Sequence, residues 1–152
     1  MSIENELKSR SDLVDKPNII AVSKTFPINE IKPLIDYGHL HYGENKVQEA
    51  LKKWSDIKNT YNNIKLHMIG KLQTNKANKA VELFDYIHSL DNQKLADTLK
   101  KHEINKNKKL SYFIQVNIGN EKQKSGVSLG DVDDFFTYCV KELNLNILGL
   151  MA

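Results

Sequence analysis

The stretch Ile19-Ile20-Ala21-Val22-Ser23-Lys24, followed by Thr25-Phe26-Pro27, decides how the rest of the chain is interpreted. The run is short, apolar and rich in β-branched residues, which predicts a buried strand that ends at Lys24. Because side chains alternate along a strand, Lys24 shares a face with Ile20 and Val22. We expect partial burial to leave more of its amine neutral and able to form a Schiff base with a carbonyl group. The alternative is a strand-end lysine that reaches into solvent.

Five further strands are predicted, and amphipathic helices separate them. The predicted strands cover residues 40–43, 65–70, 86–90, 110–118 and 147–151. The first intervening helix carries an apolar stripe and is expected to end at Gly38; the stripe is Ile28, Ile31, Leu34 and Ile35. Asp91 is the expected N-cap of a later helix, and a weakly patterned helix over residues 4–14 is expected to pack across one end. Regular alternation of strands and helices predicts a parallel sheet with right-handed crossovers.

Two architectures fit this alternation, an open doubly wound sheet and a (β/α)8 barrel. No Gly-x-Gly-x-x-Gly motif follows the first strand, which argues against a dinucleotide-binding sheet. Polar residues instead follow almost every strand, as in the active sites of barrels; they include Lys24, Asn45, Lys71, Gln73, Asn75, Ser89 and Asn117. We therefore predict an α/β fold of the (β/α)8 barrel type. Since a barrel usually needs roughly 250 residues, residues 1–152 are expected to form a single partial barrel domain with six of eight strands.

Composition narrows the class of protein. The chain has 152 residues, a net charge of +3 and a single cysteine, Cys139, so an intrachain disulfide is excluded. Lysines are scattered among acids, which argues against nucleic-acid binding. The histidines show no metal-ligand spacing, so no metal site is expected. Neither a secretory signal nor a stretch of ~20 apolar residues is present, and we expect a cytoplasmic protein without membrane contact.

Seven motifs in order resemble one family. They are Ala21-Val22-Ser23-Lys24-Thr25, His41-Tyr42-Gly43-Glu44-Asn45, the run from His67 to Lys76, Ile87-His88-Ser89, Gln115-Val116-Asn117, Lys124-Ser125-Gly126-Val127 and Gly149-Leu150-Met151-Ala152. The family is the pyridoxal phosphate homeostasis proteins, also described as proline synthase co-transcribed homologues. It is similar in fold to the N-terminal barrel domain of alanine racemase.

The resemblance implies a pyridoxal 5'-phosphate (PLP) site in which Lys24 holds the cofactor as a Schiff base. The other cofactor-binding residues that it implies are Asn45, His67, Ser89, Asn117 and Met151. For some of these positions the residues alone also allow a structural role: Asn45 as a helix N-cap, His67 as a satisfied core residue and Ser89 as the start of a helix turn. Lys122 and Lys124 form either a phosphate-attracting loop or solvated surface. No catalytic residue is assigned.

The sequence departs from the family pattern in two respects. It contains neither the last two strands nor the arginine- and glycine-containing segment that grips the phosphate in the family. Phe26 also replaces a second lysine that several relatives carry. We therefore expect open edges at strands one and six, covered by formation of a homodimer.

The leading interpretation is a PLP carrier in intracellular vitamin B6 homeostasis, with PLP-requiring apoenzymes as partners. One alternative is a PLP-dependent enzyme resembling amino-acid racemases. Another is a lyase in which Lys24 attacks a substrate carbonyl without a cofactor, and a last one is a partial barrel that binds nothing.

Overall fold

The computed structural model describes residues 3–10, 17–119 and 125–152. Its strands are β1 (Ala21–Val22), β2 (His41–Glu44), β3 (Lys65–Met68), β4 (Tyr86–Leu90), β5 (Ser111–Asn117), β6 (Val127–Ser128) and β7 (Asn146–Met151). Its α-helices are α1 (Ile3–Ser9), α2 (Ile28–Asp36), α3 (Val47–Thr60), α4 (Ala77–Leu83), α5 (Gln93–Lys106) and α6 (Val132–Thr137). Short 3₁₀ turns, η1 (Thr74–Lys76) and η2 (Leu129–Asp131), precede α4 and α6, and a π-helical turn, η3 (Tyr138–Glu142), follows α6.

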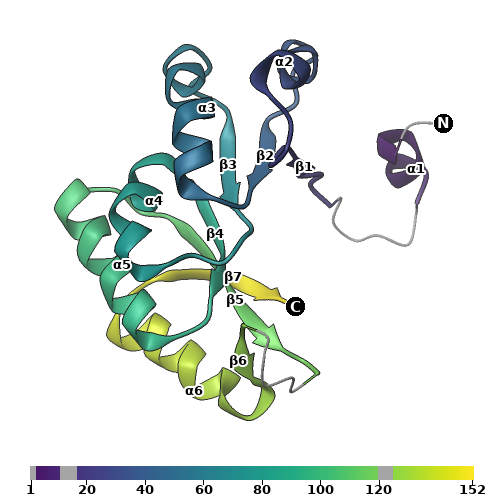
Figure 1. The fold of residues 1–152 in the computed structure, drawn as a ribbon. Helices are drawn as coiled ribbons and strands as arrows, with labels where there is room; N and C mark the ends of the chain where they lie inside the picture. Colours follow the sequence, from purple (N-terminus) through teal and green to yellow (C-terminus); the bar gives the residue numbers. More distant parts are fainter. Residues whose placement is uncertain (1–2, 11–16, 120–124) are drawn as a thin grey trace.

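The strands pair in the order in which they occur in the chain. Parallel pairs run from β1 through β2, β3 and β4 to β5, and β7 pairs with the other side of β5. The short β6 pairs only with the carboxyl end of β5. An order that never reverses, with right-handed crossovers, places successive helices on one face, as in a barrel. Figure 1 shows helices α2 to α6 arranged around the outside of the sheet.

The main core lies between the sheet and this layer of helices. Six strand residues that face the helices are at most 1% exposed: Tyr42, Leu66, Met68, Ile87, Tyr112 and Ile114. From α3, the fully buried Trp54 packs its ring 4.8 Å from that of Tyr42. Burial of each such side chain contributes about 1.5–3 kcal/mol to the free energy of unfolding. The alternation of apolar residues along the strands therefore determines which face of the sheet packs against the helices.

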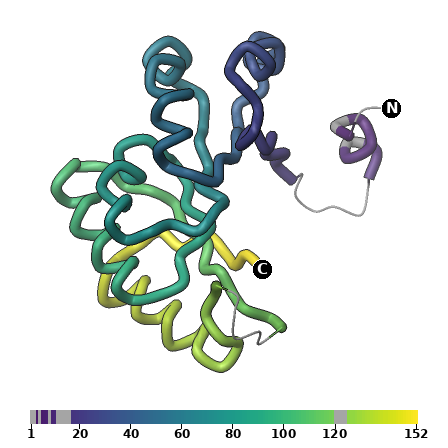
Figure 2. The backbone as a smooth tube through the Cα atoms, in the orientation of Figure 1, coloured from purple at the N-terminus to yellow at the C-terminus, as the bar shows by residue number. Residues whose placement is uncertain are grey.

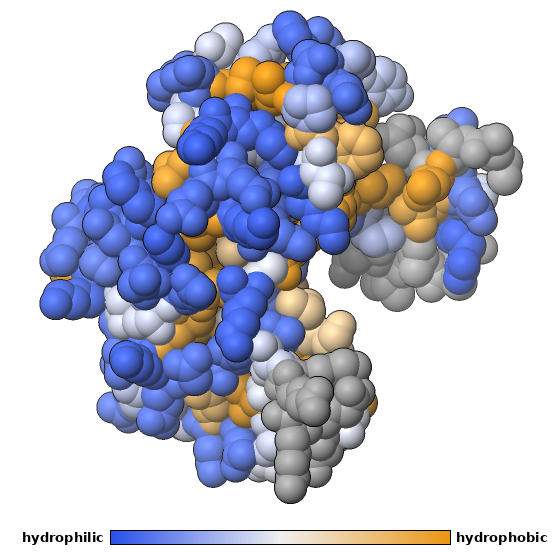
Figure 3. All heavy atoms as spheres, viewed as in Figure 1, coloured by the Kyte–Doolittle hydropathy of each residue, from blue (hydrophilic) through white to orange (hydrophobic). Residues whose placement is uncertain are grey.

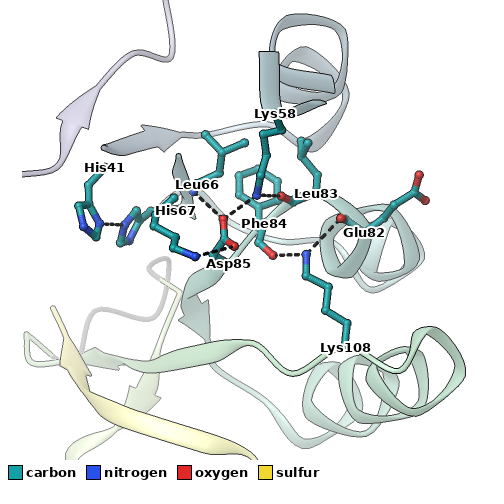
Figure 4. A network of polar contacts seen from close by, with 10 residues as sticks. His41, Lys58, Leu66, His67, Glu82, Leu83, Phe84, Asp85 and Lys108 are labelled. Atoms are coloured by element: carbon teal, nitrogen blue, oxygen red, sulfur yellow. Dashed lines mark hydrogen bonds and ion pairs between the residues drawn. The ribbon is translucent and has the colours of Figure 1, made fainter. Parts of the chain in front are cut away.

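The amino ends of the strands are joined by an ionic network around Asp85, shown in Figure 4. The Asp85 carboxylate accepts hydrogen bonds from Lys58 Nζ at 2.7 Å and from the Leu66 backbone N–H at 2.9 Å. Lys108 Nζ lies nearby and donates to the Phe84 carbonyl at 2.8 Å, and burial lowers the pKa of this lysine. These contacts tie α3, β3 and β4 together at the end of the sheet away from the polar strand ends.

Several predictions about local structure are confirmed. The strands predicted over 65–70, 86–90, 110–118 and 147–151 coincide with β3, β4, β5 and β7 to within two residues. Helix α2 ends at Asp36, and Gly38 adopts a φ of +100°, which a residue with a Cβ atom adopts at a cost. The parallel sheet with six successive strands is also confirmed.

Other predictions are wrong. Regular pairing of β1 covers only Ala21–Val22, because this outer strand has a neighbour on one side only among the described residues. Leu34 is 37% exposed, whereas Ile31 and Ile35 are buried and Ile28 packs against the core in part. The N-cap of α5 is Asn92 rather than Asp91: the Asn92 side-chain oxygen accepts the Leu95 N–H at 2.9 Å.

The amino-terminal helix is shorter than predicted and lies apart. Helix α1 covers Ile3–Ser9, and part of the predicted range, residues 11–14, lies outside the described residues. Figure 2 shows α1 separated from the sheet and its helices, on the side of β1. The expectation that this helix packs across one end of the sheet is therefore wrong.

Gly70 allows the loop after β3 to lie directly against the end of β2. A Cβ atom built at Gly70 would stand 2.3 Å from the Asn45 carbonyl oxygen. We expect Gly70→Ala to lower the free energy of unfolding by about 1–3 kcal/mol, because the two backbone segments must separate. The matched control is Gly130→Ala, where the added methyl group would meet nothing within 4 Å. Urea denaturation of both variants tests this, and equal loss in the two would contradict it.

Candidate functional site

Lys24 follows β1 in a turn and its side chain is exposed. The partial burial predicted for it from the apolar stripe is therefore wrong in this structure. The preceding residue, Ser23, donates its backbone N–H to the Gly43 carbonyl at 3.0 Å, which fixes the end of β1 against β2. The Ser23 side chain is buried on the helix side of the sheet. Strand alternation therefore directs Lys24 to the opposite face, away from the helices.

A buried carboxylate holds this turn. Glu44 is fully buried, and its Oε1 accepts hydrogen bonds from Ser23 Oγ at 2.8 Å, Lys53 Nζ at 2.8 Å and Trp54 Nε1 at 2.9 Å. Lys53 Nζ also donates to the Ser23 carbonyl at 2.7 Å. We call Ser23, Glu44, Lys53 and Trp54 the Glu44 network. It joins the end of β1, the end of β2 and the middle of α3 directly beside Lys24.

The Glu44 network is a buried ion pair in which both charges are hydrogen-bonded. The side chain of Lys53 is only 12% exposed and that of Glu44 is inaccessible. Removal of one partner from such a pair leaves an uncompensated buried charge, which is costly. The Glu44 Oε2 has no hydrogen-bond partner among the described residues. The network therefore specifies one position for the turn that carries Lys24.

Three histidines form a hydrogen-bonded chain across β2, β3 and β4. His41 Nδ1 lies 2.9 Å from His67 Nε2, and His67 Nδ1 lies 2.9 Å from His88 Nε2. The His67 ring also stacks on Tyr86, with ring centroids 4.3 Å apart. Because each neutral imidazole donates one hydrogen bond and accepts another, the chain is satisfied when all three rings are neutral. We call these residues the histidine chain; Figure 4 shows its first link.

Both nitrogens of His67 are therefore used inside the protein, which favours the alternative of a satisfied core residue over a cofactor contact. Burial, together with His88 and His41, lowers the pKa of His67 to about 3. Burial likewise lowers the pKa of His41 and of His88. The chain is consequently uncharged near neutral pH.

The other predicted site residues lie at the carboxyl ends of the strands. Ser89 is 2% exposed, and its hydroxyl has no hydrogen-bond partner among the described residues. Asn45 is half-buried at the end of β2 and lines a pocket of about 430 Å³ with residues of the loop after β3. Asn117 lines a separate pocket of about 230 Å³ with η2, and Met151 is half-buried at the end of β7.

The structure thus brings these predicted residues to one end of the sheet, where Asn45 and Asn117 line two different pockets. Lys122 and Lys124 lie outside the described residues. No group of three His, Cys, Asp or Glu side chains within residues 3–10, 17–119 and 125–152 is arranged to hold a metal ion. Among the same residues, no helix has the length and apolar character needed to cross a membrane.

Sequence reasoning missed the two arrangements that shape the site. Glu44 and Lys53 are nine positions apart in β2 and α3, and only the fold brings them together. A signal was present nonetheless, because an acid that shares a strand face with the apolar Tyr42 must find a buried partner. The histidine chain was missed for the same reason: its members come from three different strands and meet only in the folded chain.

Comparison with known proteins places this fold and site in a class. The model of the family described as alanine racemase, N-terminal domain, matches residues 2–152. A pyridoxal phosphate homeostasis protein of Aquifex aeolicus is 38% identical over 134 residues, which is 88% of this chain and 58% of the relative. The chain therefore belongs to the alanine racemase N-terminal domain family and, within it, to the pyridoxal phosphate homeostasis proteins. The resemblance seen in the sequence is confirmed.

Solved structures agree with this assignment. Two structures of PipY from Synechococcus elongatus, one without PLP and one with PLP bound, are 34% identical to this chain, with TM-scores of 0.84 and 0.82. The matches cover 97% of this chain and 68% of PipY. An alanine racemase of Clostridium difficile is 10% identical to this chain, with a TM-score of 0.68. This match covers 91% of the chain and 36% of the racemase, and it shows the fold alone. The predicted alanine racemase-type barrel fold is confirmed, and the chain spans 58% of the length of its Aquifex relative.

The lowered pKa of His67 predicts an acid-sensitive fold. The unfolded histidine takes up a proton near pH 6.5, whereas the folded one does so only near pH 3, so the unfolded state binds more protons in this range. The free energy of unfolding should therefore fall as the pH drops from about 6.5 toward 3, by up to ~1.4 kcal/mol per pH unit. Denaturant unfolding at several pH values measures this dependence.

His67→Gln should flatten that pH dependence, whereas His102→Gln, on helix α5 and outside the histidine chain, should leave it as in the parent chain. An unchanged slope in His67→Gln would show that His67 is not the group responsible.

Proposed function

We propose that this chain binds pyridoxal 5'-phosphate covalently through Lys24 and serves in intracellular PLP homeostasis. The observation that carries the proposal is the position of Lys24: an exposed amine at the carboxyl end of β1, directed away from the helices and anchored by the Glu44 network. In binding, Lys24 Nζ would condense with the cofactor's aldehyde carbon and release one water. The Aquifex relative, a pyridoxal phosphate homeostasis protein, and the PLP-bound form of PipY support this choice of cofactor.

The residues present fit such a ligand. A primary amine at Lys24, a half-buried amide at Asn45 and a buried hydroxyl at Ser89 lie at the carboxyl ends of β1, β2 and β4. The Ser89 hydroxyl has no hydrogen-bond partner within the described residues. An unsatisfied buried hydroxyl is costly unless a ligand or water completes its hydrogen bonding. We further propose contacts from Asn117 and Met151, which lie at the same end of the sheet. Bound PLP would supply electrophilic and electron-accepting chemistry, for which no catalytic residue is assigned here.

A carrier role suits an arrangement in which the amine is exposed and the members of the histidine chain are neutral and bonded to one another. PLP-requiring apoenzymes are the proposed recipients, and nucleic acid and membranes are not proposed as partners. We also propose a cytoplasmic location. The single cysteine, Cys139, is buried, and burial raises the pKa of its thiol to about 12, which keeps it protonated and unreactive.

Lys24→Ala is expected to abolish covalent attachment of PLP while leaving the fold intact, because the exposed side chain makes no core contact. The measurement is intact-mass and peptide mass spectrometry after incubation with PLP and borohydride reduction. Lys94→Ala, which removes an exposed lysine from α5, is the control and should be labelled like the parent chain. Label retained in Lys24→Ala, for example on Lys71, would overturn the proposal.

The outer strands support a second proposal, that two copies of this chain associate. Val22 on β1 is 48% exposed, and Leu148 and Leu150 on β7 are 52% and 59% exposed. Each outer strand has a neighbour on one side only among the described residues. Figure 3 shows hydrophobic residues on the side where β1 and the end of β7 lie, whereas hydrophilic residues cover most of the helices. Unprotected strand edges with apolar side chains recruit another strand.

A variant with Leu148→Lys and Leu150→Lys should shift the chain toward the monomer, because two charges on the edge cannot be buried in a dimer contact. Light scattering across a concentration series measures the mass of both forms. Phe136→Lys, on an exposed face of α6, controls for the loss of a surface apolar group. A monomeric parent chain at high concentration would refute the dimer.

A further inference from the structure

The pocket of about 430 Å³ at the ends of β2 and β3 is distinct from the face that carries Lys24. We call it the lysine pocket; its lining residues are Asn45, Lys46, Val47, Gln48, Met68, Lys71, Leu72, Gln73 and Lys76. We propose that the lysine pocket binds a small phosphate ester, as a second ligand site of this protein. The proposal does not depend on PLP binding at Lys24.

The lysine pocket opens on the helix side of the sheet. Met68 pairs in register with Glu44, whose carboxylate lies among α3 residues, so both side chains face the helices. Lys24 is directed to the other face, and only Asn45 belongs to both neighbourhoods. The pocket is built by two segments, residues 45–48 at the start of α3 and residues 71–76 leading into α4. Its position separates it from the proposed cofactor site.

The charges that line the lysine pocket have one sign. Three lysines and no carboxylate line it. Lys46 is paired with Glu49 outside the pocket at 2.8 Å, but neither Lys71 nor Lys76 forms an ion pair within the described residues. Lys76 is half-buried, as are Lys53 and Lys58, and those two lysines each have a carboxylate partner. Two ammonium groups without partners match the two negative charges of a phosphate monoester.

The remaining lining fits a short organic group attached to that phosphate. Val47, Met68 and Leu72 are at most 5% exposed and form an apolar floor. The side-chain amides of Asn45, Gln48 and Gln73 surround it with donors and acceptors. A volume near 430 Å³ lies at the small end of ligand pockets. The class of ligand is therefore a small phosphorylated metabolite, rather than a nucleotide polymer or an apolar molecule.

The test uses glycerol 3-phosphate as the probe, in phosphate-free buffer, with ¹H–¹⁵N correlation spectra of the whole chain. We expect saturable shifts in the amides of residues 45–48 and 70–76. In a variant with Lys71→Ala and Lys76→Ala, the affinity should fall at least tenfold. A variant with Lys94→Ala and Lys101→Ala on α5 loses the same net charge from exposed positions, and it should bind like the parent chain.

Two comparators sharpen the result. Glycerol, which lacks the phosphate, should cause no saturable shift, and succinate should bind at least tenfold more weakly, because a carboxylate places less charge at one point. The proposal is overturned if the amide shifts do not saturate, if the Lys71 and Lys76 variant binds as tightly as the control, or if succinate equals glycerol 3-phosphate. Loss of PLP labelling at Lys24 would bear only on the proposed function and not on this site.

Discussion

The structure depends on one buried carboxylate. Glu44 gathers three hydrogen-bond donors on a single oxygen, from the end of β1, from the ammonium of Lys53 and from the indole of Trp54. Because β1 is an outer strand with only two regularly paired residues, its own ladder holds it weakly. The Glu44 network supplies the missing constraint and fixes Ser23 on the helix side. Lys24, the next residue, is thereby directed to the opposite face.

The amino and carboxyl ends of the strands differ in how their polar groups are bonded. At the amino ends, the Asp85 carboxylate accepts hydrogen bonds from Lys58 and from the backbone of β3. Across the strands, the histidine chain uses both nitrogens of His67 and stays uncharged near neutral pH. At the carboxyl ends, by contrast, an amine, an amide and an unsatisfied hydroxyl are exposed or unpaired. In barrel proteins the carboxyl ends of the strands usually carry the functional site, whereas the amino ends contribute to stability.

The sequence was sufficient for the fold because the relevant signals are local. The apolar alternation of residues 110–118 and the glycine at position 38 predicted β5 and the end of α2 to within about two residues. The exposed position of Lys24 was not predictable, because strand periodicity predicts which face of the sheet a side chain occupies but not how deeply that side chain is buried. Glu44 with Lys53 and the histidine chain were missed for another reason: their members meet only after the strands are paired. The cap at Asn92 differed by one residue, which side-chain geometry alone decides.

The central claim is that the Glu44 network presents Lys24 on the sheet face away from the helices, where it binds PLP. A crystal structure of this chain soaked with PLP tests it most directly. The account predicts electron density continuous with Lys24 Nζ on that face, with Ser23, Lys53 and Trp54 still bonded to Glu44. Density joined to another lysine, or PLP found only on the helix side among Lys71 and Lys76 with Lys24 unmodified, would contradict it.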